Sequence, residues 1–303
     1  MNFIVTGGAG FIGSHLTKHL IKTGHDVTVI DSLRRGSFDN LKEIKDKIDF
    51  QEIDILDYEK MRDVAKNVNG VFHQAALGSV PDSFKEPEEY HRVNVVGTEN
   101  VFKLAKEFDF KVVYASSSSV YGNQEKFPIK EDADKNPLNP YGKTKLDCEH
   151  LAKKYADLGV KIIGLRYFNV FGIGQNLNYA GVILKFIERL TQHKPPIIYG
   201  DGNQLRNYIF VDDVVKANVL AFESKIEHEF INIATGETIS VKELAHLMIR
   251  LSGLSLDPIF EKAREGDIER SQADISLAKK LLDWEPKTTL EEGLEKIFPK
   301  IES

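Results

Sequence analysis

Residues 1–13 read MNFIVTGGAGFIG, and this stretch decides the fold. The apolar run at residues 3–5 is typical of a buried strand, and the apolar stripe over residues 11–21 predicts a helix. Four glycines form the turn between them: Gly7, Gly8, Gly10 and Gly13. The spacing Gly-x-Gly-x-x-Gly allows a tight turn, lets a pyrophosphate approach the backbone and lets the helix pack on the strand. Because a helix amino end attracts anions, the stretch predicts a dinucleotide site.

A second apolar run at residues 26–31 ends in Asp31. A carboxylate at this position accepts hydrogen bonds from ribose hydroxyls and repels a 2′-phosphate, which favours NAD over NADP. Arg34 and Arg35 follow closely and are the local argument for NADP; the alternative is that they are solvated loop arginines. A glycine-rich turn without any ligand is the simplest alternative for the whole unit.

Composition is that of an ordinary globular protein, with 303 residues of which 42% are hydrophobic and 28% charged. Forty basic against 46 acidic residues give a net charge of −6, which disfavours nucleic acid and anionic membranes as partners. The single Cys148 excludes an internal disulfide and suits a reducing compartment. The amino end has the pattern of a fold strand and not of a signal peptide. We therefore expect a cytoplasmic protein, and we assign no metal ligand.

Strand-like and helical patterns alternate over the first part of the chain. Strands are expected at 2–6, 26–31, 48–53, 70–73, 110–116 and 160–167, and helices at 11–22, 58–67, 87–107 and 138–158. This alternation predicts an α/β fold with a doubly wound parallel sheet of the Rossmann type. Helices near 180–192, 211–223, 240–252 and 275–283 then follow with short strands between them, so we expect a second, smaller α/β lobe that binds substrate.

We divide the chain accordingly into an NAD-binding domain, residues 1–171, and a substrate-binding domain, residues 172–303. A segment at about 207–236 is expected to return to the first domain. The charged, proline-containing loop 122–140 is expected to be a surface segment between a strand end and a helix, and is called the flap below.

Tyr141 and Lys145 are four residues apart at the start of a predicted helix and therefore share one face. The serine run 116–119 ends the strand before them. An ordinary tyrosine ionises only near pH 10, so a catalytic base working near pH 7 needs about 4 kcal/mol of added stabilisation of its phenolate. A nearby lysine and the positively charged nicotinamide could supply it, and a serine hydroxyl could orient the substrate oxygen.

These motifs together resemble the extended short-chain dehydrogenase/reductases, and among them the nucleotide-sugar 4-epimerases. The resemblance runs nearly end to end and is carried by TGGAGFIGSH, Asp54-Ile55, HQAA at 73–76, Asn94-Val95-x-Gly97-Thr98, SSSSVYG at 116–122, YGKTK at 141–145, RYFNVFG at 166–172, Arg264-x-Gly266-Asp267, Ala273-Asp274 and Leu281-x-x-Trp284-x-Pro286.

The resemblance implies a role for each matching residue. Tyr141 transfers the proton, Lys145 promotes its ionisation and holds the nicotinamide ribose, and Ser117 binds the reacting sugar oxygen, with Ser116 and Ser118 as weaker candidates. His73 and Asn94 are expected to be structural and not catalytic. The implied cofactor-binding residues are Gly7, Gly10, Phe11, Ile12, Gly13, Asp31, Asp54, Ile55, Ala75, Tyr141 and Lys145.

The reaction that the resemblance implies is epimerisation at C4 of the sugar. Related dehydratases and decarboxylases carry a carboxylate two residues before the tyrosine of V-Y-G, where this chain has Ser119. Simple redox chemistry remains: Tyr141 takes the proton of the 4-hydroxyl, hydride passes to NAD, the 4-keto sugar turns over and hydride returns to its other face. NAD ends unchanged and should stay bound.

The substrate is expected to be a UDP-hexose. Arg206 and Arg264 match family contacts to the pyrophosphate, and Asn169 matches another phosphate contact. Residues 171–176 supply no cation for a sugar carboxylate, which disfavours glucuronate. Ser271 takes a position filled by a bulky tyrosine in epimerases confined to glucose and galactose, so we expect UDP-GlcNAc and UDP-GalNAc as substrates, with UDP-Glc and UDP-Gal also accepted.

Two alternatives remain open at this point. One is another nucleotide-sugar epimerase or reductase, acting on UDP-glucuronate or a dTDP-sugar. The other is a non-catalytic NAD-binding regulatory protein. The family usually forms homodimers through the helices expected here at 87–107 and 138–158, and we expect the same of this chain. No role is assigned to Arg270.

Overall fold

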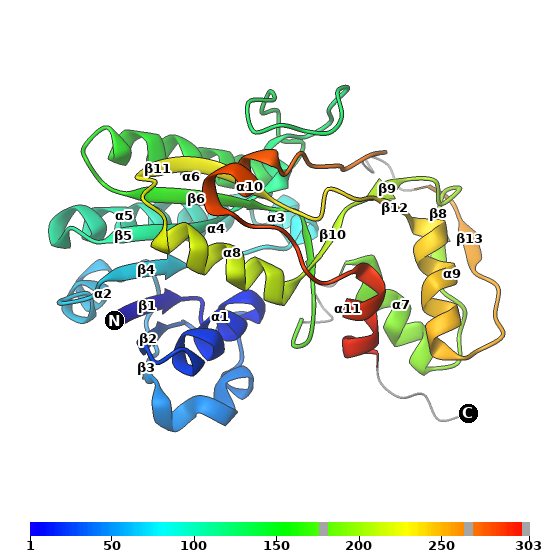
Figure 1. The fold of residues 1–303 in the computed structure, drawn as a ribbon, viewed down its shortest axis with the longest axis horizontal. Coiled ribbons are helices and arrows are strands. Elements are labelled where there is room, and N and C mark those ends of the chain that lie inside the picture. Colours follow the sequence, from blue (N-terminus) through cyan, green and yellow to red (C-terminus); the bar gives the residue numbers. More distant parts are fainter. Residues whose placement is uncertain (176–180, 264–268, 299–303) are drawn as a thin grey trace.

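The computed structural model of the chain describes residues 1–175, 181–263 and 269–298. Its centre is a seven-stranded parallel sheet with the strand order β11-β6-β5-β4-β1-β2-β3 (Figure 1). The strands of this sheet are β1 (Asn2–Thr6), β2 (Asp26–Ile30), β3 (Asp49–Gln51), β4 (Gly70–His73), β5 (Lys111–Ser117), β6 (Ile162–Tyr167) and β11 (His228–Ile233). The order reverses next to β1, so the sheet is doubly wound as expected.

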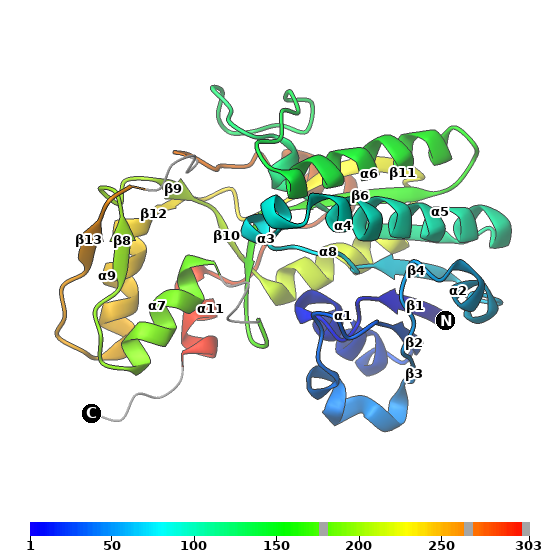
Figure 2. The same ribbon diagram turned by 180° about the vertical axis from the view of Figure 1, so that it is seen from behind.

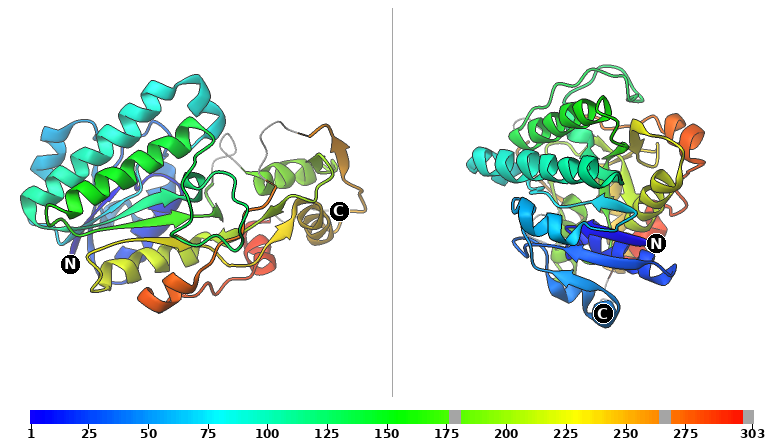
Figure 3. Two further views of the ribbon diagram at one scale, coloured as in Figure 1. Left: turned by 90° about the horizontal axis from the view of Figure 1, so that it is seen from above. Right: turned by 90° about the vertical axis from the view of Figure 1, so that its left-hand side faces the viewer.

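Helices cover both faces of the sheet, as the views from above and from the side show (Figure 3). On one face lie α2 (Tyr58–Val64), α3 (Val80–Lys85), α4 (Pro87–His91), α5 (Gly97–Phe108) and α6 (Pro140–Ala156). On the other lie α1 (Phe11–Lys22), α8 (Val211–Glu223) and α10 (Ser276–Leu282). Two buried apolar layers result, one on each side of the strands.

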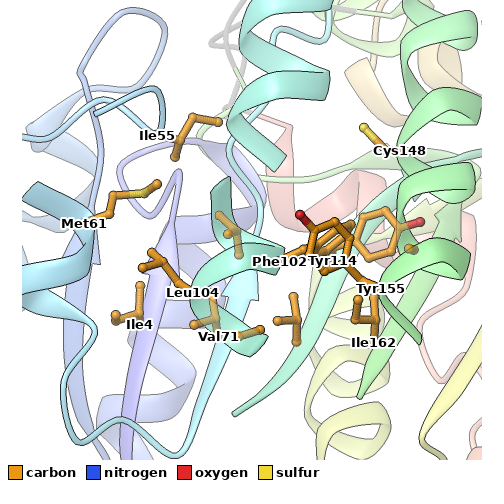
Figure 4. Close-up of a cluster of buried hydrophobic side chains, with 14 of the residues drawn as sticks. Ile4, Ile55, Met61, Val71, Phe102, Leu104, Tyr114, Cys148, Tyr155 and Ile162 are labelled. Carbon is orange, nitrogen blue, oxygen red and sulfur yellow. The ribbon is translucent and has the colours of Figure 1, made fainter. Parts of the chain in front are cut away.

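Alternation along the strands explains these two layers. Ile4 faces the layer under α5 and α6, whereas its neighbours Phe3 and Val5 face the layer under α1 and α8. Figure 4 shows part of the first layer, in which Val71 and Tyr114 from the sheet lie among side chains that include Phe102 of α5. Because both faces are buried, the strands read as continuous apolar runs.

A smaller group of elements lies beyond the carboxyl ends of the strands (Figure 2). It has its own apolar core, contributed by α7, α9 and α11 among others. Its elements are β7 (Asn169–Phe171), α7 (Val182–Thr191), β8 (Ile197–Tyr199), β9 (Leu205–Arg206), β10 (Tyr208–Phe210), β12 (Ile239–Ser240), α9 (Val241–Ser252), β13 (Ile259–Glu261) and α11 (Leu290–Ile297). β10 pairs with β7, β12 with β9 and β13 with β8.

Several boundaries differ from the sequence expectation. The helix expected at 87–107 is α4 and α5 joined by a π-helical turn, Arg92–Val96, and the helix expected at 138–158 begins at Pro140 because Asn139 caps it. The 3₁₀ helix Phe38–Lys47, α3 and α11 were not anticipated. α3 spans only six residues, and the sequence of the 3₁₀ helix is strongly charged.

The proposed division of the chain is compatible with this arrangement, since α8 and β11 pack into the sheet layer. α10 and Trp284 also pack there, so the return to the sheet extends beyond residue 236. Among the described residues, we find no helix with the length and apolar character needed to cross a bilayer.

Candidate active site

A cavity of about 420 Å³, called the main cavity here because the expected site residues line it, lies at the carboxyl ends of the central strands. Every residue expected to contact the cofactor lines it, and so does Ser117. These residues are Gly7, Gly10, Phe11, Ile12, Gly13, Asp31, Asp54, Ile55, Ala75, Ser117, Tyr141 and Lys145. Residues from six separate parts of the sequence thus meet in one place, where ligands bind in open α/β sheets.

The glycine turn is shaped by two close approaches. Gly7 has a φ of +68°, and a Cβ there would lie 2.6 Å from the backbone nitrogen of Ala75. A Cβ on Gly13 would collide with the carbonyl oxygen of Gly7, so only glycine allows α1 to begin this close to the turn. The side-chain-free backbone leaves a cradle at the amino end of α1, which fits a pyrophosphate.

Asp31 directly follows β2, and two backbone N–H groups hold its carboxylate. Oδ2 accepts from the Ala9 N–H at 3.0 Å and Oδ1 accepts from the Leu33 N–H at 2.8 Å. Burial raises the pKa of Asp31, although these hydrogen bonds oppose the rise. The remaining acceptor capacity of the carboxylate fits ribose hydroxyls, and its charge is incompatible with a nearby 2′-phosphate.

Arg34 also lines the cavity, but it is engaged by carboxylates. Its Nη2 lies 2.9 Å from Asp54, and its Nη1 donates to Glu89. A guanidinium already paired with two acids is poorly placed to bind a phosphate. The geometry therefore agrees with NAD and weakens the local argument for NADP.

Tyr141 and Lys145 lie in the first turns of α6. Asn139 caps this helix by accepting from the Gly142 N–H, and Pro140 occupies the first helical position, which suits its fixed φ. Lys145 is buried and donates from Nζ to the carbonyl oxygen of Ala115 at 2.8 Å. Its ammonium group lies 5.9 Å from the centre of the Tyr141 ring.

Neighbouring serines of the run have different surroundings. Ser116 donates to Glu149 at 2.7 Å and is buried. Ser117 lies at the end of β5, and its hydroxyl accepts from the Ser119 N–H at 3.1 Å, which leaves its own proton available. Ser118 begins a short 3₁₀ turn and is absent from the cavity lining among the described residues. Ser117 is thus the serine best placed to bind a substrate oxygen.

His73 and Asn94 are held by internal hydrogen bonds. The His73 ring lies between the hydroxyls of Thr6 at 2.6 Å and Thr98 at 2.8 Å, and burial lowers its pKa to about 3. The Asn94 amide bonds both backbone groups of Leu77 and the hydroxyl of Thr144. These contacts tie the helices to the sheet, which is a structural role.

A second cavity of about 270 Å³ adjoins the first, and Val170 and Gln175 line both. Asn169 and Arg206 line this second cavity, with the Asn169 amide donating to the Asn207 carbonyl at 2.7 Å. The structure therefore brings two of the expected phosphate contacts together beside the main cavity. The third, Arg264, lies outside the described residues.

Ser271 is not among the described residues that line either of these two cavities. Its N–H donates to the carbonyl oxygen of Leu205 at 3.0 Å, so it sits beside the strand that carries Arg206. Arg270, to which no role is assigned above, stacks on the ring of Phe127 at 4.7 Å and thereby contacts the flap.

Sequence reasoning missed several lining residues. Gln74 and Tyr167 line the main cavity and are hydrogen-bonded to each other, and Tyr199 and Gln204 line the second cavity together with Gln175. Gln74 lies within the HQAA motif and Tyr167 within the RYFNVFG motif, so the family resemblance could have identified both. Tyr199 and Gln204 have no local signature.

Comparisons with known proteins agree with this geometry. Residues 3–234 match the model of the NAD dependent epimerase/dehydratase family. A putative UDP-glucose 4-epimerase of Methanocaldococcus jannaschii is 40% identical over 299 residues, covering 97% of this chain and 96% of the relative.

Two solved structures are also closely similar. UDP-glucose 4-epimerase of Thermotoga maritima, solved with UDP-glucose, superposes with a TM-score of 0.94 at 37% identity, covering 99% of this chain and 98% of that one. UDP-N-acetylglucosamine 4-epimerase of Methanobrevibacter ruminantium, in complex with UDP-N-acetylmuramic acid, superposes with a TM-score of 0.94 at 37% identity, covering 98% and 96%.

Proposed function

Because this chain belongs to the NAD-dependent epimerase/dehydratase family and is an NAD-dependent UDP-sugar 4-epimerase, we propose that it interconverts UDP-GlcNAc and UDP-GalNAc and also accepts UDP-Glc and UDP-Gal. The observation that carries this proposal is the small Ser271, whose N–H bonds the carbonyl oxygen of Leu205 in the strand that carries Arg206, and Arg206 lines the second cavity. A serine there leaves room for a 2-acetamido group, whereas a tyrosine would fill it.

When bound, NAD would supply the hydride acceptor and donor needed at C4 of the sugar, and the glycine turn and Asp31 would hold it. Tyr141 removes the proton of the 4-hydroxyl as the sugar is oxidised and returns it when the 4-keto sugar is reduced. Lys145 favours the phenolate through its charge, and its bond to Ala115 fixes the ammonium group in place. Ser117 orients the sugar oxygen by donating its free hydroxyl proton.

Arg206, Arg264 and Asn169 are proposed to hold the pyrophosphate of the nucleotide. A guanidinium matches the geometry and charge of a phosphate, and Asn169 and Arg206 line the same cavity. The sugar would then extend through the opening that Val170 and Gln175 border, toward the catalytic residues. We further propose that the protein is a cytoplasmic homodimer joined through α4, α5 and α6.

The decisive experiment is a substrate panel. Purified protein supplied with NAD is incubated with UDP-, dTDP-, GDP- and ADP-sugars, including UDP-glucuronate, and the products are resolved by chromatography. We expect both acetamido and hydroxyl UDP-hexoses to epimerise without stoichiometric growth of reduced-nicotinamide absorbance. Turnover of UDP-Glc with UDP-GlcNAc unchanged would refute the assignment of Ser271, and accumulation of reduced cofactor would indicate a dehydrogenase.

A further inference from the structure

Beneath the catalytic face lies a connected set of buried polar side chains that the reaction itself does not use. Its members are Ser116 of β5, Tyr121, Glu149 of α6, Arg166 of β6 and Asn232 of β11, and we call it the buried relay. Each of these side chains is almost fully removed from solvent. Buried polar groups are costly unless they are bonded, so their arrangement is sharply defined.

One end of the relay is anchored on the catalytic helix. Tyr141, Lys145 and Glu149 follow one another at intervals of four residues, which places them along one side of α6. Glu149 accepts from the Ser116 hydroxyl at 2.7 Å and from Nε and Nη2 of Arg166, both at 2.8 Å. The residue before Ser117 is thus fixed to the helix that carries the other two catalytic groups.

The relay then runs away from the helix through two further hydrogen bonds. Nη1 of Arg166 donates to the Tyr121 hydroxyl at 2.7 Å, and that hydroxyl donates to Oδ1 of Asn232 at 2.6 Å. Burial raises the pKa of Tyr121, so its hydroxyl keeps its proton and remains a donor over the working pH range. The amide of Asn232 turns toward the flap.

The far end of the relay holds the chain segment that carries Ser271. Nδ2 of Asn232 donates to the carbonyl oxygens of Ile129 at 3.0 Å and of Asp274 at 3.2 Å. Asp274 belongs to residues 269–274, called the gate segment here. A backbone bond from the Asp274 N–H to Ile129 at 2.8 Å joins the gate segment to the flap at the same point.

On its other side, the gate segment pairs with β9. The Ser271 N–H donates to Leu205 and the Leu205 N–H donates to Glu269. The segment therefore spans the distance between the strand of Arg206 and the end of the relay. Ser271 thus lies between two attachments, one to β9 and one at Asp274, where Asn232 and Ile129 both hold the segment.

We propose that Tyr121 and Asn232 are positioning residues for substrate selection, which set the width of the site at C2 of the sugar by fixing the gate segment relative to α6. This inference rests on the proposed role of Ser271. Neither side chain needs to touch the substrate. The relay acts through geometry, because a buried hydrogen-bonded chain that starts on the catalytic helix permits few positions for its far end.

The test removes one link without disturbing packing. Tyr121→Phe deletes the hydroxyl that joins Arg166 to Asn232. Tyr90→Phe is the matched control, since it deletes an equally buried hydroxyl that donates to the Ser79 carbonyl at 2.7 Å, away from the gate segment. The quantity measured is the ratio of kcat/KM for UDP-GlcNAc to kcat/KM for UDP-Glc.

This ratio does not depend on the fraction of folded enzyme, so a merely structural loss leaves it unchanged. We expect it to fall at least threefold in Tyr121→Phe, because the larger acetamido sugar is more sensitive to the width of the site, and to stay at the wild-type value in Tyr90→Phe. A smaller fall, or a rise, in Tyr121→Phe overturns the proposal.

Hydrogen exchange supplies a readout that does not depend on activity. The amides of Ser271 and Asp274 are expected to exchange at least tenfold faster in Tyr121→Phe and in Asn232→Ala, and at the wild-type rate in Tyr90→Phe. If the wild-type enzyme turns over only one of the two sugars, the proposed substrate range is wrong, and the positioning role is then tested by the hydrogen-exchange rates alone. Unchanged exchange rates in both Tyr121→Phe and Asn232→Ala would overturn the positioning role.

Discussion

Nζ of Lys145 lies 5.9 Å from the centre of the Tyr141 ring and is held there by a 2.8 Å bond to the carbonyl oxygen of Ala115. The lysine is therefore held in a fixed position beside the tyrosine, on the same helix. The proposed proton abstraction by Tyr141 would take place next to this cation.

Tyr141→Phe is expected to lower kcat by two to four orders of magnitude, roughly the contribution of a positioned acid–base group. Loss of one hydroxyl leaves the glycine turn and Asp31 intact, so the purified variant should still carry NAD. Turnover is measured with a UDP-hexose as substrate. The amount of bound NAD is measured separately, from the absorbance of the cofactor released when the protein is denatured. Near-normal turnover would show that Tyr141 is not the proton-transfer residue. If the variant had lost NAD, its low activity would reflect weaker cofactor binding and not a loss of proton transfer.

Ser117→Ala and Ser116→Ala separate two serines that are adjacent in sequence. We expect Ser117→Ala to reduce kcat at least about tenfold with little change in stability, because its hydroxyl donates to no acceptor that we find among the described residues. Ser116→Ala removes a bond to the Glu149 carboxylate and should cost about 1.5–3 kcal/mol of unfolding free energy. Denaturant unfolding and steady-state kinetics are measured on both variants. If Ser116→Ala lost activity and Ser117→Ala lost stability, Ser116 would be the substrate-binding serine and Ser117 the structural one.

The parts of the site whose geometry depends on residues close together in the sequence could be predicted from the sequence. The glycine turn, Asp31 and the Tyr141–Lys145 spacing each depend on a strand end or on one or two helical turns, and all of them line one cavity. The family resemblance then joined them to Ser117.

Side-chain pairing across the fold could not be predicted in this way. Arg34 is paired with Glu89 and Arg166 with Glu149, and neither pairing has a periodic or motif signal. The same is true of Tyr121 and Asn232, which lie far apart in sequence and meet only because β11 joins the sheet beside β6. Ser271 could be identified only by counting along a family motif.

Ser271→Tyr is expected to suppress activity on UDP-GlcNAc selectively, since a phenol ring fills the space proposed for the acetamido group. A loss of at least about tenfold in kcat/KM, equal to about 1.4 kcal/mol, is expected for UDP-GlcNAc, with a smaller loss for UDP-Glc. Ser271→Ala is the matched control and should keep both activities. Equal losses on the two sugars would count against steric gating.

Asp31→Ala should weaken NAD binding by roughly 10- to 100-fold, since hydrogen bonds to a carboxylate contribute about 1.5–3 kcal/mol. It should also reduce discrimination against NADP, because the charge that repels a 2′-phosphate is gone. Calorimetric titration of both cofactors measures the two effects. Asp49→Ala, at an exposed position on the neighbouring strand, is the control. If Asp31→Ala still preferred NAD over NADP as strongly as the wild type, another residue would be responsible for the cofactor preference.

His73 is expected to make the fold sensitive to acid. Its pKa is about 3 in the folded protein and near 6.5 when exposed, because burial between Thr6 and Thr98 disfavours the charged ring. Between these two values the unfolded chain binds a proton that the folded chain does not, so stability falls as the pH is lowered from about 6.5 toward 3. The contribution of this one group approaches about 1.4 kcal/mol per pH unit.

His73→Asn removes the group that binds a proton in the unfolded chain, and it keeps a polar side chain that can hydrogen-bond both threonines. The variant should be less stable than wild type at pH 7.5, but its loss of stability between pH 6.5 and 4.5 should be smaller by up to about 3 kcal/mol. Urea denaturation across this range measures the difference, with His91→Gln on the surface as the control. Parallel curves for wild type and His73→Asn would mean that carboxylates alone account for the acid sensitivity.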